Sequence, residues 1–277
     1  MRNVPRRPLT ARSVLASTLL GADPPELPVA YLVHVASLFG VNENRARVAL
    51  SRMAQAGEAT SVGPGRYRLA GHLLERQQRQ TASRLGTTRS WRGGWHVVVV
   101  TTAGSLPGVR SERRRAFERA RLAELRDGTW IRPDNLELEL PENVGQDVVS
   151  FIGPLGRLGR LGSSSLEPEP ATLCRFATEL FRLEEWSKAA RVLLDELTAS
   201  RPGGPEQLAD GFVLSAAVLR HLQADPLLPV DLLPADWLGE RLRRAYDGWD
   251  RSYRELLADW SRRWREGDGS PGPRALR

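Results

Sequence analysis

An amphipathic helix followed at once by a hairpin constrains the fold of this chain more than any other feature of its sequence. The helix is predicted to begin after Asn42, a residue type that favours N-caps, and to end at Gly57. Between these two residues, apolar side chains recur at i, i+3, i+4 and i+7, which predicts one buried stripe along the helix. Its members are Ala46, Ala49, Leu50 and Met53.

A hairpin is predicted directly after this helix. Glu58–Val62 and Arg66–Ala70 flank a Gly-Pro-Gly sequence, which is typical of a tight turn. Two shorter helices are predicted upstream, one after an N-cap at Thr10 and one that begins at Pro28. Three helices followed by a hairpin is the order of a winged helix-turn-helix, which we expect over residues 1–70.

The face of the third helix that lies opposite the apolar stripe is polar and flanked by arginines. In helix-turn-helix proteins this face enters the major groove, where Arg can bond guanine, Asn can bond adenine and an apolar side chain can contact a thymine methyl. Two more arginines on the hairpin place positive charge where a wing would cross the DNA backbone. The predicted DNA-binding residues are Asn44, Arg45, Arg47, Val48, Ser51, Arg52, Arg66 and Arg68.

Two simpler interpretations of these arginines stay open. Arg45 and Arg52 could contact phosphates, which would position the protein without reading the base sequence. They could also be solvated side chains of an ordinary surface helix, and for Arg52 taken alone this interpretation is favoured. DNA binding is therefore predicted by the whole set, with cap, helix and hairpin in order, and not by one residue.

The sequence after the hairpin predicts a linker and two further domains. Residues 71–90 are polar and helix-compatible, which predicts a linker helix. Residues 166–266 carry only helical patterns and predict an all-helical C-terminal domain. The segment 267–277 is rich in Gly, Ser, Pro and Arg, and this composition predicts a disordered tail.

Residues 91–165 are predicted to form a small central α/β sandwich. Four consecutive valines within His96–Thr101 indicate a buried strand, and Glu112–Leu125 is a basic amphipathic pattern with Leu125 facing inward. A β-α-β-β run of this kind suggests a ferredoxin-like domain, so the fold class expected for the chain is multidomain α+β. The other segments with strand character are Gly128–Arg132, Leu136–Leu140 and Asp147–Ile152.

Composition and scattered polar residues favour a binding protein over an enzyme. The net charge of +7 favours polyanionic partners, although it does not decide the fold. The single Cys174 allows neither an internal disulfide nor a cysteine pair for zinc, and the four histidines have no metal-ligand spacing. With no apolar run of about 18 residues to span a membrane, we expect a cytoplasmic protein without a cofactor or metal.

Three separated motifs resemble those of a known family, the PaaX-like repressors named for phenylacetic acid degradation. Val41–Glu43, Arg47–Met53 and Gly57 resemble the recognition-helix region, and Gly128–Leu136 resembles the central-domain signature. The motifs follow in the family's order and span nearly the whole chain, which makes the resemblance specific. The segments similar to the C-terminal signature are Arg220–Leu222, Asp225–Pro229 and Leu232–Trp237.

The resemblance implies a winged helix, a Cas2-like ferredoxin-fold middle and a helical C-terminal domain in a homodimer. It implies a repressor of a catabolic operon that releases double-stranded operator DNA when an acyl-CoA such as phenylacetyl-CoA binds. Neither the family motifs nor the residue patterns predict which side chains would bind that effector.

Two other classes of function stay open. A Cas2-like domain raises the alternative of a metal-dependent nuclease, in which a catalytic Asp ends the first strand. Here Thr101 and Thr102 follow the valines, so we expect no carboxylate for a metal at that point and a scaffold without nuclease activity. A protein-interaction module is the other alternative, and it predicts no salt-dependent affinity for DNA.

Overall fold

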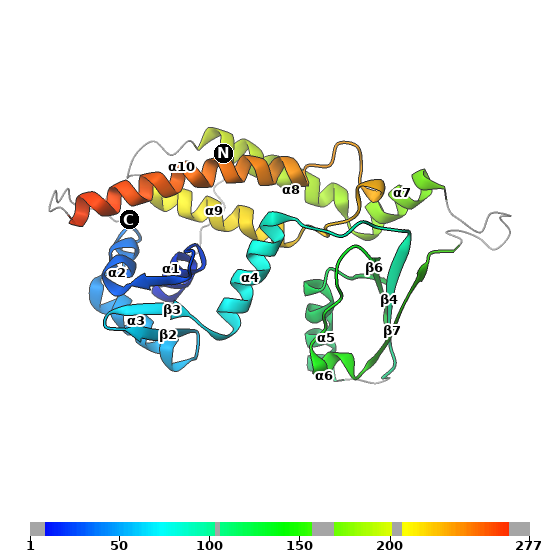
Figure 1. Cartoon of the computed structure of the whole chain (residues 1–277), viewed down its shortest axis with the longest axis horizontal. Helices are drawn as coiled ribbons and strands as arrows, with labels where there is room; N and C mark the ends of the chain where they lie inside the picture. Colours follow the sequence, from blue (N-terminus) through cyan, green and yellow to red (C-terminus); the bar gives the residue numbers. More distant parts are fainter. Residues whose placement is uncertain (1–8, 103–105, 157–168, 201–206, 266–277) are drawn as a thin grey trace. The chain divides into compact units, whose positions relative to one another are not determined.

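The computed structural model describes residues 9–102, 106–156, 169–200 and 207–265. Within them the fold is mixed α+β, with many helices and two antiparallel sheets (Figure 1). The chain divides into two compact units, of which the first comprises Met1–Leu85, Leu193–Gln223 and Leu242–Arg277 and the second comprises Gly86–Val192 and Ala224–Arg241. The tail predicted over 267–277 lies outside the described residues.

Three helices open the first unit, α1 (Ala11–Leu20), α2 (Val29–Ser37) and α3 (Glu43–Gln55), and both predicted N-caps are confirmed. The Thr10 side chain accepts a hydrogen bond from the Ser13 amide at 3.1 Å, and Asn42 Oδ1 accepts one from the Arg45 amide at 2.9 Å. Each bond satisfies an amide that the first helical turn leaves without a backbone partner. Buried side chains of all three helices share one core, led by Leu15, Leu19, Leu32, Leu50 and Met53.

A three-stranded antiparallel sheet in the order β1-β3-β2 packs with these helices. Strands β2 (Ala59–Gly63) and β3 (Arg66–Leu69) are the predicted hairpin, and Gly65 at its turn has a φ of 68°, which glycine adopts without strain. Strand β1 (Glu26–Pro28) is not predicted by the sequence, because it is short and ends in proline. Its pairing with β3 along the sheet edge, where proline is tolerated, defines it.

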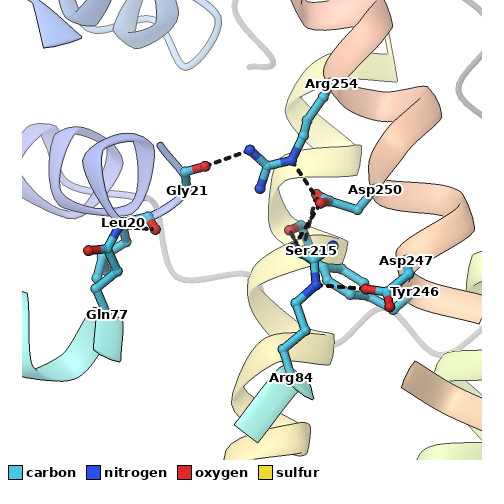
Figure 2. Close-up of polar contacts among 9 residues, drawn as sticks. All are labelled: Leu20, Gly21, Gln77, Arg84, Ser215, Tyr246, Asp247, Asp250 and Arg254. Atoms are coloured by element: carbon cyan, nitrogen blue, oxygen red, sulfur yellow. Dashed lines mark hydrogen bonds and ion pairs between the residues drawn. The ribbon is translucent and has the colours of Figure 1, made fainter. Parts of the chain in front are cut away.

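Helix α4 (Gly71–Leu85), α9 (Leu208–Gln223) and most of α10 (Gly239–Arg265) also belong to the first unit, and a buried carboxylate joins α4 to α10. The Asp250 side chain is 5% exposed and lies 3.2 Å from Arg84 and 2.7 Å from Arg254 (Figure 2). Burial lowers the pKa of Arg84, but its bond to Asp247 at 2.6 Å and the charge of Asp250 outweigh burial and raise that pKa. Asp250 is therefore neutralised by two arginines that stay charged.

The same network ties the end of α1 to α4 and α10 (Figure 2). Arg254 donates a hydrogen bond to the Gly21 carbonyl oxygen at 2.7 Å. Gln77 of α4 donates to the carbonyl oxygens of Leu20 at 3.3 Å and Ala22 at 2.9 Å. Because the last carbonyls of a helix have no backbone partner within it, these side chains cap α1 while they anchor it.

The second unit contains a four-stranded antiparallel sheet in the order β5-β6-β4-β7. Helices α5 and α6 lie on one face of the sheet (Figure 1), over a core that includes Val98, Phe117 and Trp130. In chain order the elements are β4 (Gly94–Val100), α5 (Pro107–Arg119), β5 (Ala123–Arg126), β6 (Thr129–Pro133), α6 (Glu142–Gly145) and β7 (Val148–Pro154).

The other face of this sheet packs against the C-terminal part of the second unit. Trp95 and Ile131 of the sheet are at most 1% exposed beside Leu183 and Leu232. The elements on this side are α7 (Pro170–Leu180), the start of α8 (Leu183–Ala199) and the short 3-10 helix η2 (Val230–Leu232). The sheet is thus covered on both faces near Trp95.

One helix prediction for this unit is wrong in its bounds. The helix expected over Glu112–Leu125 begins at Pro107, a residue type that favours the first helical turn, and ends at Arg119. Leu125, expected to face inward, is exposed in β5. The chain turns at Arg121, whose φ of 59° is left-handed and cannot continue a right-handed helix.

Two further expectations are corrected. Leu136–Leu140 is not a strand, although Leu138 and Leu140 do pack against the core under α5. The helix expected over Leu173–Glu184 is broken between α7 and α8 at Arg182, whose φ of 54° is again left-handed. In both cases alternating or periodic leucines recorded burial, which irregular segments also provide.

Asp250→Ala should lower the free energy of unfolding by about 3 kcal/mol, because it leaves Arg84 facing a partly buried site without its carboxylate partner. Urea unfolding followed by circular dichroism measures this change. Asp259→Ala is the matched control, since it removes an exposed carboxylate 2.7 Å from Arg262 and should cost less than about 1 kcal/mol. Equal, small losses in both variants would contradict a central role for Asp250.

Candidate nucleic-acid interface

The exposed face of α3 carries all six helix residues that the sequence nominated. Ala46, Leu50 and Met53 are at most 1% exposed, whereas Val48 is 43% exposed despite being apolar. The helical period forces this separation, because residues three and four apart share a face. The nominated residues, all exposed, are Asn44, Arg45, Arg47, Val48, Ser51 and Arg52.

A hollow of about 640 Å³ lies between the start of α1 and α3. Four of the nominated residues line it, and Thr10 and Arg12 of α1 complete its rim. Arg12 was not predicted as part of a site, since an isolated arginine near a helix start carries no signal of what it will face. The nominated residues that line the hollow are Asn44, Arg45, Val48 and Arg52.

Arg12 is held at this hollow by Glu58, a buried carboxylate that also lines it. The Arg12 Nε donates to Glu58 Oε2 at 2.8 Å, and a second guanidinium nitrogen donates to Oε1. His72 Nε2 lies 3.7 Å from the same carboxylate. The hydrogen bond from Arg12 outweighs burial and lowers the pKa of Glu58, so the carboxylate stays ionised and fixes the guanidinium at the rim.

Arg47 has a different environment from the residues of the hollow. It lies 2.7 Å from Glu43, one turn earlier on α3, and both side chains are more than half exposed. An exposed pair at i and i+4 is worth only a few tenths of a kcal/mol. Arg47 can therefore exchange Glu43 for another anion at little cost.

The two nominated hairpin arginines share one carboxylate. Arg66 and Arg68 alternate along β3 and so lie on one face, where Arg66 is 2.9 Å and Arg68 is 2.7 Å from Glu26. Both hydrogen bonds lower the pKa of Glu26, which stays ionised. Two cations on one anion leave a single net positive charge, fewer than the sequence indicated, because the strand that carries Glu26 was not predicted.

The end of the first central strand differs from the expectation of no nearby carboxylate. Asp147 lies there, since its carbonyl oxygen accepts a hydrogen bond from the Thr101 amide at 3.0 Å. Its carboxylate is 3.6 Å from Arg113, which also donates to Thr102 at 3.1 Å. Among the described residues, no group of three or more His, Cys, Asp or Glu side chains could hold a metal ion.

The hydrophobicity of the helices was also examined along the described ranges of the chain. None of the helices there is both long and apolar enough to cross a bilayer.

The chain matches known proteins over both ends and in its fold. The PaaX-like protein family matches residues 10–73, and the PaaX-like protein C-terminal domain matches residues 181–266. A solved structure, that of the uncharacterized protein Rv0674 from Mycobacterium tuberculosis, is 36% identical, covers 91% of this chain and 98% of its own, and has a TM-score of 0.69. No curated protein matches. The chain belongs to the PaaX-like family, which indicates a transcriptional regulator and not a catalytic role.

Glu58→Gln should lower the free energy of unfolding by about 1 kcal/mol at pH 7, because it removes the charge that Arg12 bonds. The folded-state pKa of Glu58 is depressed, so its contribution is complete above the unfolded value of about 4.3 and disappears as the pH falls through the lower folded value. Urea unfolding at pH 7 and near pH 3 measures both limits. Glu43→Gln, at an exposed pair, is the control, and a Glu58 effect that does not change with pH would contradict this assignment.

Proposed function

We propose that this protein is a sequence-specific transcription regulator, acting as a repressor, that binds double-stranded operator DNA through α3. The observation that carries the proposal is the exposed polar face of α3, set beside a hollow rimmed by Arg12 and followed by a basic hairpin. A helix with this placement, after a turn from α2, is the recognition element of helix-turn-helix proteins. Membership in the PaaX-like family supports the regulatory role.

The proposed domain organisation is that of a winged helix-turn-helix over residues 1–70, a linker helix over 71–90, a ferredoxin-like domain over 91–165 and a helical domain over 166–266. Supporting the first, α1 to α3 share one core with the β2–β3 hairpin. Supporting the third, the β-α-β-β-α-β chain order with strands in the order β5-β6-β4-β7 is that of a ferredoxin-like sheet.

The nominated residues divide into two proposed roles. Asn44, Val48 and Ser51 lie at the centre of the exposed face, and with Arg47 they would meet base edges in the major groove. Arg45 and Arg52 flank this face and would contact phosphates, as would Arg12 at the rim of the hollow.

The hairpin would contribute less than its two arginines suggest. Arg66 and Arg68 must exchange Glu26 for a phosphate before either can bind DNA. Since Glu26 keeps its charge, one arginine at a time is available at low cost. We therefore assign most of the specific affinity to α3.

The effector proposed from the family resemblance is an acyl-CoA such as phenylacetyl-CoA, acting on a homodimer. Such a ligand can release DNA only if it binds the DNA-free geometry more tightly than the DNA-bound one. Titrating a panel of acyl-CoA thioesters into the protein–operator complex tests this proposal, because one thioester should release the DNA at micromolar concentration. Release by none of them would remove the acyl-CoA from the account and leave the DNA-binding proposal in place.

A nuclease and a protein-interaction module are the competing functions. Against the nuclease, the carboxylate of Asp147 at the end of β4 already has Arg113 as its ion-pair partner. Incubation with nucleic acids and Mg²⁺ or Mn²⁺ separates the two, since cleavage abolished by Asp147→Ala would overturn the regulator. A protein-interaction module would show no affinity for DNA that falls as salt rises.

Arg47→Ala should weaken binding to the operator about 10- to 100-fold, with a much smaller loss on a random duplex, because a bidentate contact to guanine discriminates by about 1–3 kcal/mol. Fluorescence anisotropy on both duplexes at matched salt measures the two losses. Arg191→Ala, an exposed arginine on α8, controls for the lost charge. Equal losses on operator and random DNA would demote Arg47 to a phosphate contact.

A further inference from the structure

Strand β7 exposes an apolar edge of the central sheet. Val149, Phe151 and Ile152 are 56%, 55% and 56% exposed, the densest group of exposed large apolar residues in the described chain. No charged residue occurs between Val148 and Leu155. Large apolar side chains gathered on a surface in this way mark an interaction site more often than isolated ones do.

The two edges of the sheet differ in how they are protected. The opposite edge strand, β5, is four residues long and carries Glu124 and Arg126, and Glu124 is ion-paired with Arg114. Short length and charge are the usual means by which a protein keeps an edge from pairing with another chain. β7 has neither, because it pairs with β4 over seven residues and is uncharged throughout.

The outer edge of β7 has no strand partner among the described residues. Its inner edge pairs with β4, and the register places Phe151 beside Val97 and Val149 beside Val99. These four side chains share the face on which Trp95 is buried. The apolar surface of the sheet therefore continues from its buried part out to an unprotected edge.

We propose that β7 of a second copy of this chain pairs antiparallel with this edge, about a two-fold axis at Phe151. Such pairing sets Phe151 against its own symmetry mate, Val149 against Gly153 and Ser150 against Ile152, so that no charges are opposed and glycine leaves room for valine. The same surface patch on both subunits is what a two-fold interface requires. The two central sheets then form one continuous sheet.

The choice of a second copy as occupant rests on the proposed function. A regulator that reads two half-sites needs two α3 helices related by a two-fold axis, and β7 pairing supplies that axis within the central sheets. An unrelated protein or another segment of the same chain would bury the same side chains without this symmetry. Mass and cross-linking separate these occupants.

Sedimentation equilibrium of the purified full chain without DNA is the first test. The wild type should have the mass of two chains of 30.8 kDa each, and Phe151→Lys should have the mass of one. Val192→Lys on α8 is the matched control, since Val192 is also 55% exposed, and it should remain a dimer. A monomeric wild type at tens of micromolar, or a dimer unaffected by Phe151→Lys, would overturn the proposal.

Cross-linking locates the axis independently of any loss of stability. Residues directly opposed in an antiparallel pair lie about 4.5–5.5 Å apart at Cα, within disulfide range. With Cys174→Ala removing the native thiol, Phe151→Cys should form a covalent dimer on mild oxidation, whereas Val192→Cys should not. A dimer that Phe151→Cys does not cross-link would place the interface elsewhere.

The outcome is separable from that of the proposed function. If β7 pairing fails and α3 still binds operator DNA, only the interface is wrong. If the dimer forms and cross-links but has no affinity for DNA, the interface stands and the regulator proposal falls.

Discussion

The separation of α3 into a buried stripe and an exposed polar face is the constraint on which the candidate site depends. Leu50 and Met53 are at most 1% exposed, and burying each such side chain stabilises the fold by about 1.5–3 kcal/mol. Because the helical period couples the two faces, this burial fixes the direction of Asn44, Val48 and Ser51. The same residues that hold the domain together therefore orient the surface proposed to bind DNA.

Features that were local in the sequence could be predicted, and features that join distant segments could not. The caps at Thr10 and Asn42, the hairpin and the buried valine strand each have a nearby signal, and all are present. Strand β1 exists through its pairing with β3, so the carboxylate that binds Arg66 and Arg68 was missed with it. Arg12 was missed for the same reason, since Glu58 is distant in sequence.

Ion pairs decide how much of the positive charge near the site is available to a polyanion. Glu26 and Glu58 each hold an arginine that composition alone counts as free charge. Within the first unit, Asp250 likewise engages Arg84 and Arg254, and Arg254 reaches the end of α1 (Figure 2). The helices that carry the candidate interface are thus linked by buried polar bonds to α10, which gives changes around Asp250 a physical route to α1.

Methylation protection on the duplex upstream of the chain's own gene tests the central claim most directly, because dimethyl sulfate attacks guanine N7 in the major groove. The account predicts protected guanines in major grooves that face one side of the duplex, about one helical turn or a multiple of it apart. Protection confined to the minor groove, or a pattern no different from that of a random duplex, would contradict insertion of α3 into the major groove.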